Sequence, residues 1–170
     1  MSDSFIPLLQ FFVATGEVVG RKKCQKLVHI LQECGYNFGF DFKLALYGAY
    51  SSTLQSQLES FVENRYIIEI PDVTNKAAFR TSKFITNRHG TTILKILGQD
   101  QEPQWKELAN YLNSRSTRDL EATSTIMFLR HGGTSDDQLR ERFDALKPHL
   151  NDIYDSGLAL ADELRIQITK

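Results

Sequence analysis

The chain has 170 residues, of which 41% are hydrophobic and 24% charged, and its formal net charge is −1. These values predict a folded protein and exclude a chain that is disordered over most of its length. Its longest apolar runs fall far short of the roughly 20 residues of a membrane span, and its first residues lack the features of a secretory signal. We therefore expect a cytoplasmic protein that does not enter a membrane.

Charge is divided unevenly along the sequence. Residues 1–98 carry 11 Lys and Arg against 8 Asp and Glu, whereas residues 99–170 carry 9 against 13. A dedicated nucleic-acid-binding protein is usually far more basic. The balance permits DNA binding by the first half without arguing for it.

The first half predicts three helices and several strands. Apolar residues recur at helical spacing over residues 5–16, 21–33 and 51–64. Residues 17–20 form a short extended connector, residues 41–47 alternate as a strand closed by Gly48, and residues 66–70 and 78–85 form two strands around the polar turn 72–76. Three helices followed by such a hairpin are the layout of a winged helix-turn-helix, with the third helix as recognition helix and the hairpin as wing.

The second half predicts helices alone. We expect them over residues 86–97 and 104–113, then from Ser116 or Thr117 to the Gly132–Gly133 pair, from a capping box at Ser135 to Pro148, and from a cap at Asn151 onward. The predicted fold class is α+β and mostly helical. It comprises a winged helix-turn-helix domain over residues 1–97 and a helical C-terminal subdomain over residues 98–170.

Two cysteines and one histidine lie in the second predicted helix. Cys24 and Cys34 are about 15 Å apart along a helix, too far for a disulfide, so we expect free thiols. His29 lies five positions from each cysteine, and steps of five turn the side chains away from a common point. We therefore predict neither a metal site nor a cofactor.

A short motif resembles that of an enzyme family. Arg130, His131 and Gly132 match the Arg-His-Gly signature of the histidine phosphatases, in which the histidine follows a parallel strand. Here the preceding segment predicts a helix, and the glycines are better interpreted as its stop signal. We therefore predict no catalytic residues and no enzymatic activity.

The basic residues of the first half are the candidate nucleic-acid contacts. Arg21, Lys22, Lys23 and Lys26 would neutralise phosphates, Ser52, Thr53 and Gln55 would face the groove, and Arg80 and Lys83 would lie on the wing. Against this assignment, residues 51–64 contain no Lys or Arg and carry two glutamates. The alternative is that the basic residues form an ordinary solvated face.

Four segments resemble the YwgA-like family of bacterial proteins: Gly16–Leu27, Leu46–Ser51, Arg118–Ile126 and Leu146–Pro148. This chain has Cys24 where the family has Leu, and Ala49 where it has Pro. A more distant resemblance links the Gln-Lys-Leu helix and the late Lys-Pro pair to the Panacea-type domains of toxin–antitoxin systems. The resemblances imply a winged-helix fold, a regulatory role for the first family and protein partners for the second.

Two functions follow as hypotheses. The first is a DNA-binding transcriptional regulator whose C-terminal extension supplies an effector surface or a homodimer contact. The second is a protein–protein interaction module, antitoxin-like or adaptor-like, that uses the same fold without binding DNA.

Overall fold

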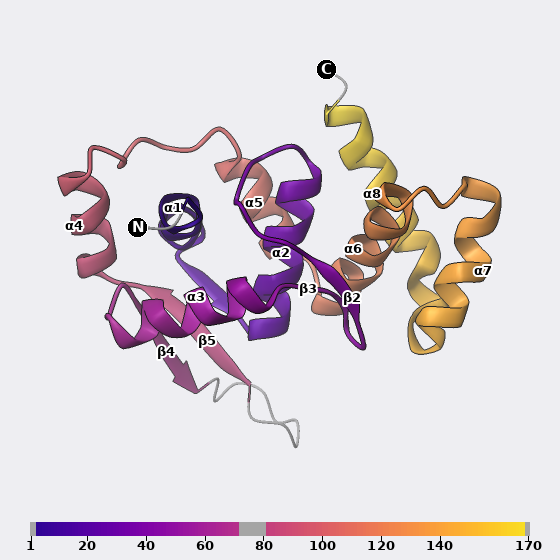
Figure 1. The fold of residues 1–170 in the computed structure, drawn as a ribbon, viewed down its shortest axis with the longest axis horizontal. Helices are drawn as coiled ribbons and strands as arrows, with labels where there is room; N and C mark the ends of the chain where they lie inside the picture. Colours follow the sequence, from indigo (N-terminus) through magenta and orange to yellow (C-terminus); the bar gives the residue numbers. More distant parts are fainter. Residues whose placement is uncertain (1–2, 72–80, 169–170) are drawn as a thin grey trace.

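The computed structural model describes residues 3–71 and 81–168, the side chains of residues 167 and 168 excepted. Helices and strands alternate in the first half, and helices alone form the second (Figure 1). The elements are α1 (Phe5–Thr15), β1 (Glu17–Val19), α2 (Arg21–Glu33), β2 (Lys43–Ala45), β3 (Gly48–Tyr50), α3 (Ser52–Glu63), β4 (Ile67–Pro71), β5 (Ser82–Thr86), α4 (Arg88–Ile96), α5 (Lys106–Asn113), α6 (Thr117–His131), α7 (Asp136–Leu146), the 3₁₀ helix η1 (Pro148–Ile153) and α8 (Tyr154–Ile168). The predicted α+β, mostly helical class is confirmed.

The main sheet has three antiparallel strands in the order β1-β5-β4. The predicted pairing of β4 with β5 is confirmed, with Glu69 opposite Phe84, while the polar turn between them lies outside the described residues. The segment predicted as an extended connector is a third strand, since Val18 also pairs with Phe84 from the other side. Both Val18 and Phe84 are buried, so this strand holds the sheet against the helices.

The strand predicted over residues 41–47 is confirmed only over Lys43–Ala45. This part of the chain forms a separate hairpin in which β2 pairs with β3 and Ala45 lies opposite Gly48. Leu46 and Tyr47 make the turn, and Gly48 has a φ of 87°, a left-handed conformation that favours glycine. Alternation of apolar residues could not reveal this reversal because the turn residues are themselves apolar.

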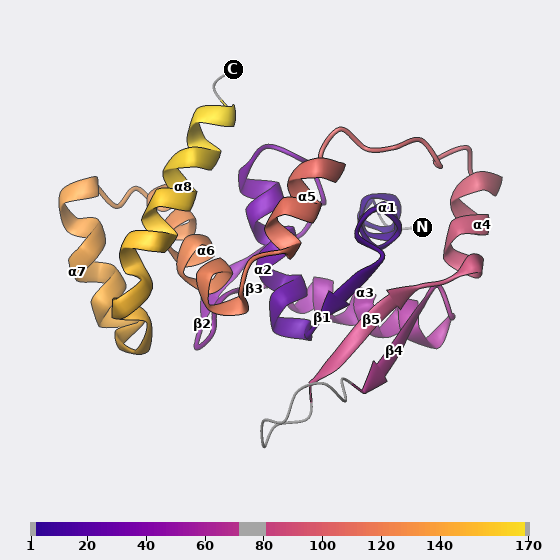
Figure 2. The same cartoon turned by 180° about the vertical axis from the view of Figure 1, so that it is seen from behind.

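A single hydrophobic core runs through both halves of the chain. Helix α6 lies in the middle and packs against α2 on one side and α8 on the other (Figures 1 and 2). All residues from Leu120 to Met127 are buried, so α6 has no exposed face over these two turns. The two predicted domains, residues 1–97 and 98–170, thus share one core. Their division at residue 97 stays a prediction.

Most helix ends lie where the sequence predicts them. The Ser51 hydroxyl accepts a hydrogen bond from the Leu54 amide at 3.3 Å, and Ser116 caps α6 in the same way. Two predicted caps are wrong. Ser135 precedes α7 but its side chain makes no capping bond, and Asn151 lies inside η1, so that the last α-helix begins at Tyr154.

Both cysteines are buried and unpaired, as predicted. Among the described residues, no group of three or more His, Cys, Asp and Glu side chains is placed to hold a metal ion. None of the helices in the described ranges combines the length and the apolar character that crossing a bilayer would require.

Candidate functional site

Arg21, the first residue of α2, is held by acidic groups of two other elements. Its guanidinium donates to both carboxylate oxygens of Glu69 on β4, at 3.1 and 2.7 Å, and lies 3.5 Å from Glu59 on α3. The hydrogen bonds from Arg21 hold the pKa of Glu69 below its ordinary value. The bidentate pair with Glu69 links α2 to the sheet, and the contact with Glu59 links it to α3. Arg21 was predicted to contact phosphate, but in the structure its charge is paired within the chain.

The other predicted phosphate contacts on α2 also have partners within the chain. The Lys22 ammonium lies 2.5 Å from Glu121 of α6. The Lys23 ammonium donates to the carbonyl of Asn113 at 2.6 Å, and burial lowers its pKa. Lys26 is 1% exposed, whereas a phosphate contact requires a cation that DNA can reach.

Of the two residues predicted to lie on the wing, Lys83 belongs to the described residues and Arg80 does not. Lys83 on β5 pairs with Glu17 on the neighbouring strand β1 at 2.9 Å. Arg80 lies outside the described residues. The described part of the β4–β5 hairpin therefore presents one cation, Lys83, and Glu17 neutralises it.

The predicted base-reading residues do lie together on the first turn of α3. Ser52 and Thr53 are exposed, and they line a shallow hollow with Ser56 and Ser60. Gln55 is half-buried and donates to Glu59 at 2.8 Å. This surface is polar but carries no positive charge of its own.

A second site, which the sequence did not predict, lies under the β2–β3 hairpin. Lysines from two distant parts of the chain donate to carbonyls of the hairpin: Lys26 to Ala49 at 2.5 Å, and Lys147 to Leu46 at 2.6 Å. Gln25 forms two further bonds of 2.9 Å with the backbone of Ser51, where the hairpin ends. The hairpin backbone is thus fixed from below by α2 and by the segment between α7 and η1.

Glu121 of α6 connects these lysines. Its carboxylate accepts a hydrogen bond from Lys147 at 3.0 Å, pairs with Lys22, and lies 3.6 Å from the His149 ring. Burial alone would raise the pKa of Glu121, but the hydrogen bonds from Lys22 and Lys147 outweigh it and lower that pKa. We call Lys22, Lys26, Glu121 and Lys147 the ionic cluster. All but Lys22 are 1% exposed.

Gly48 allows the hairpin to approach this cluster closely. A Cβ atom at position 48 would lie 3.1 Å from the Thr125 hydroxyl oxygen and 3.5 Å from the Lys26 ammonium. Together with its left-handed φ, this proximity makes glycine the residue that the position needs. The tight turn and the ionic cluster therefore depend on each other.

The hairpin presents apolar side chains to solvent. Leu46 is 77% exposed, Tyr47 59% and Tyr50 40%, and Leu146, next to Lys147 in the chain, is 42% exposed. The Lys22 ammonium lies 4.9 Å from the centre of the Tyr47 ring, a cation–π contact. Large exposed side chains on a backbone that is held by hydrogen bonds from buried side chains are features of an interaction surface.

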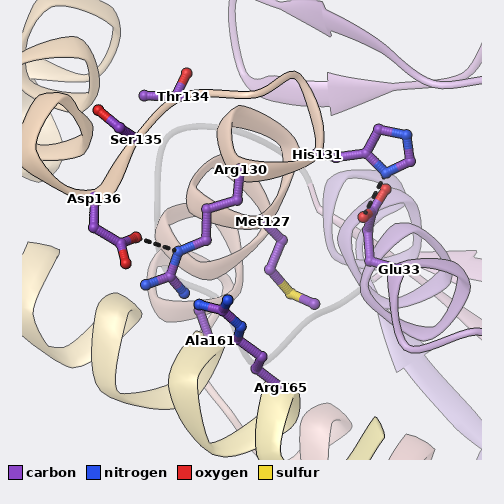
Figure 3. A pocket seen from close by; sticks show the side chains of 9 residues that line it. All are labelled: Glu33, Met127, Arg130, His131, Thr134, Ser135, Asp136, Ala161 and Arg165. Atoms are coloured by element: carbon purple, nitrogen blue, oxygen red, sulfur yellow. Dashed lines mark hydrogen bonds and ion pairs between the residues drawn. The ribbon is translucent and has the colours of Figure 1, made fainter. Parts of the chain in front are cut away.

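The Arg-His-Gly motif lies at the C-terminal end of α6, beside a pocket of about 400 Å³ (Figure 3). Gly133, with a φ of 86°, stops the helix, as predicted, and the strands described before the motif, within residues 3–71 and 81–129, all pair antiparallel. Figure 3 shows Arg130 paired with Asp136, at 3.1 Å, and His131 paired with Glu33, at 3.1 Å. Arg130 also pairs with Asp162 of α8 at 2.8 Å. These pairs fasten α6 to α7, α8 and α2.

Glu33 also lies next to a buried histidine, His29. The Nε2 atom of His29 lies 3.5 Å from Glu33 without a hydrogen bond, and its Nδ1 atom lies 2.8 Å from the Ser124 hydroxyl. A hydroxyl, an imidazole and a carboxylate in a row can activate a nucleophile, but Ser124 and His29 are 0% and 1% exposed. No substrate reaches this hydroxyl in the folded chain, so we interpret the row as internal packing between α2 and α6.

The residues missed by sequence reasoning are those whose role depends on long-range contacts. Glu121 and Lys147 were not predicted as site residues, and Lys26 was predicted to contact phosphate instead of the hairpin. Lys147, Glu121 and Lys26 are separated by 26 and 95 positions along the chain. No local signal marked Glu121, because the burial of every residue from Leu120 to Met127 becomes visible only in the structure. Leu146–Pro148 and Leu46–Ser51 already appeared together as segments of the family resemblance.

No family model matches the chain. The chain is similar to a protein of Bacillus subtilis (strain 168) named "Uncharacterized protein YwgA", with 29% identity over 161 residues that cover 93% of this chain and 94% of that protein. The winged-helix and Panacea-type assignments are not part of this similarity. The match over nearly the full length of both chains supports the resemblance of this chain to YwgA-like proteins.

Proposed function

We propose that this chain is a non-catalytic winged-helix protein that binds another protein through its β2–β3 hairpin. The order of α1, β1, α2, α3, β4 and β5, with the first strand added to the hairpin of the last two, supports the winged-helix assignment. In this assignment the β2–β3 hairpin is an insertion between the second and third helices. It supplies a surface that DNA recognition does not require.

The observation that carries the proposal is the contrast between the two sides of the hairpin. Below it, Lys26 and Lys147 are buried and hydrogen-bonded to its carbonyls. Above it, Leu46 and Tyr47 are among the most exposed large apolar side chains of the described residues. Because hydrogen bonds already hold the hairpin backbone, binding through Leu46 and Tyr47 would order little further backbone, which favours affinity.

The charges around the tip indicate the chemistry of the partner. Lys22 lies over the Tyr47 ring, and Lys43 is exposed on the outer strand of the hairpin. A complementary partner offers an apolar pocket for Leu46 and Tyr47 with acidic side chains at its rim. A second copy of this chain is another possible occupant, and the experiment below separates the two.

The test uses the tagged full-length chain in extracts of its native host, treated with nuclease. A partner that is identified by mass spectrometry should then bind the purified chain when it is produced separately. Leu46→Asp should weaken that binding at least about 30-fold, the effect of losing roughly 2 kcal/mol at a hot spot. Ile96→Asp, at a 73% exposed position on α4, is the matched control and should leave the affinity unchanged.

The proposal is wrong if the reconstituted complex binds equally well with Leu46→Asp. It is also wrong if sedimentation shows that the purified chain forms a dimer that Leu46→Asp dissociates, because the tip is then a self-association surface.

Binding of duplex DNA through α3 is the second candidate. It is favoured by the exposed Ser52 and Thr53 hydroxyls, which lie on the first turn of the predicted recognition helix. The neutralisation of Arg21, Lys22 and Lys83 by carboxylates of this chain is the observation against it. Retention on mixed genomic fragments at two salt concentrations tests it, since phosphate contacts produce a steep salt dependence.

A further inference from the structure

A cavity of about 180 Å³ adjoins the tip of the β2–β3 hairpin. It lies where the hairpin meets α2 and α3, and among its lining residues are Lys22 and Lys26 of α2, Ala45, Tyr47 and Tyr50 of the hairpin, and Gln55 of α3. Tyr47 belongs both to this lining and to the exposed tip. The cavity and the surface proposed to bind a protein are therefore continuous.

The surface that this cavity exposes is almost entirely apolar, although three of its lining residues are cations. The charged ends of these side chains are turned to other groups. The Arg21 guanidinium and the Lys22 ammonium pair with carboxylates, and the Lys26 ammonium donates to the Ala49 carbonyl. Long cationic side chains commonly cover apolar surface with their methylene groups. Those methylene groups and the tyrosine rings leave a surface that suits an apolar occupant.

The side-chain amides of the lining are also engaged within the chain. Gln25 forms two hydrogen bonds of 2.9 Å with the backbone of Ser51, and Gln55 donates to Glu59 at 2.8 Å. A site for a free small molecule usually adds a few polar groups that fix the orientation of the ligand. Here those amides are used for packing the fold, so the occupant should be held in place from outside the cavity, as a side chain of a docked protein is.

The size of the cavity limits the occupant to one side chain. Pockets for drug-sized ligands measure about 300–1,000 Å³, which is larger than this cavity. An engineered apolar cavity of about 150 Å³ takes a single benzene ring. A volume of about 180 Å³ therefore fits one aromatic ring or one branched aliphatic side chain.

We propose that the protein partner inserts one large apolar side chain into this cavity. This inference rests on the proposed function, in which Leu46 and Tyr47 enter a pocket of the same partner. The contact is then reciprocal, with each protein supplying an apolar anchor and a pocket for the anchor of the other. Paired anchors of this kind are common at the centres of protein interfaces.

The charge beside the cavity indicates what accompanies the inserted side chain. Lys43 lies opposite Tyr50 in the hairpin and two positions from Ala45, so these three residues share one face of the hairpin. Lys43 is exposed, and no described residue forms an ion pair with it. An acidic residue next to the inserted apolar residue would complement this charge. The partner segment should therefore combine one large apolar residue with an acidic neighbour.

The first test uses benzene as an apolar probe and needs no partner. Benzene is titrated into the full chain, and backbone amide signals are followed by NMR. We expect saturable shifts for residues 22–26 and 45–55. Ala45→Phe places a ring where the probe should bind and should lose these shifts, whereas Ala159→Phe, at an exposed position on α8, should keep them.

The second test uses the partner identified for the proposed function. Ala45→Phe should weaken its binding at least about tenfold, and Ala159→Phe should leave the affinity unchanged. Lys43→Glu should weaken binding about three- to tenfold, with a smaller effect at high salt, because it reverses the charge that faces the acidic neighbour. Lys95→Glu, at an exposed position on α4, is the matched control and should bind as the parent chain does.

Several results would overturn this inference. Benzene could give no saturable shift in residues 22–26 and 45–55, or the same shifts in Ala45→Phe as in the parent chain. The partner could bind Ala45→Phe as tightly as the parent chain while losing affinity for Leu46→Asp, which would leave the proposed function standing without the inserted side chain. Equal binding of Leu46→Asp would overturn both. A dimer of the purified chain that Ala45→Phe dissociates would make a second copy the occupant. The shifts of the parent chain need no variant, so the first test stands even if Ala45→Phe does not fold.

Discussion

Replacing Lys26 by Met tests the ionic cluster through the pH dependence of stability. In the folded chain the pKa of Lys26 is lowered from 10.5 to about 7, chiefly by burial. The unfolded chain therefore binds one more proton than the folded chain between about pH 7 and pH 10.5. The free energy of unfolding rises with pH wherever the unfolded state binds more protons, so Lys26 should make the protein more stable as pH increases through this window.

The size of the effect follows from the same pKa. One proton changes the free energy of unfolding by at most about 1.4 kcal/mol per pH unit, and Lys26 is half titrated at pH 7. We therefore expect this residue to contribute a gain of about 1 kcal/mol from pH 7 to pH 8 and slightly more from pH 8 to pH 9. Met keeps the length of the side chain but cannot titrate.

The assay is urea unfolding of the parent chain and of Lys26→Met at several pH values from 6 to 9. The difference between the two free energies should change by about 2 kcal/mol from pH 7 to pH 9, in favour of the parent chain. Groups common to both proteins, such as Cys24 and Cys34 with their raised pKa values, largely cancel in this difference. Lys43→Met, at an exposed position, should show no such change. If the curves for the parent chain and Lys26→Met stay parallel, Lys26 is not a desolvated lysine and the reasoning fails.

Three further changes probe the structure around the site. Glu121→Gln leaves the buried lysines without their carboxylate and should cost about 3–5 kcal/mol in urea unfolding; a loss below 1 kcal/mol would mean that the ion pairs contribute little. Gly48→Ala should cost at least about 1 kcal/mol because of the left-handed φ, and an unchanged thermal midpoint would contradict the described turn. Gly157→Ala would place a Cβ atom 2.7 Å from that of Ala122 and should cost about 1–3 kcal/mol by calorimetry, whereas Gly132→Ala, with no atom nearer than 3.5 Å, should be nearly neutral.

The helices and the β4–β5 hairpin could be predicted from the sequence because their signals are local. Apolar spacing and capping residues locate α1, α2 and α3 to within one or two positions. The β-branched residues of Ile67–Pro71 likewise indicate a strand whatever it pairs with. Such signals depend on residues a few positions apart, and no distant contact overrides them here.

The candidate site could not be predicted in the same way. A lysine in an amphipathic helix is expected on the solvated face, yet Lys26 is buried because the hairpin folds over it and offers a carbonyl. Its neighbours Glu121 and Lys147 come from the other half of the chain. The turn at Leu46 and Tyr47 could not be predicted either, because apolar residues ordinarily indicate a buried strand, whereas these two side chains are exposed.

Photo-crosslinking in living cells tests the central claim most directly. A benzophenone amino acid replaces Tyr47 at the tip of the hairpin in one strain and Ile96 on α4, also an exposed residue, in another. We predict that irradiation links position 47 to one protein of a different sequence, which then binds the purified parent chain, and that position 96 gives no such product. Equal products at both positions, or none at position 47, would contradict the account.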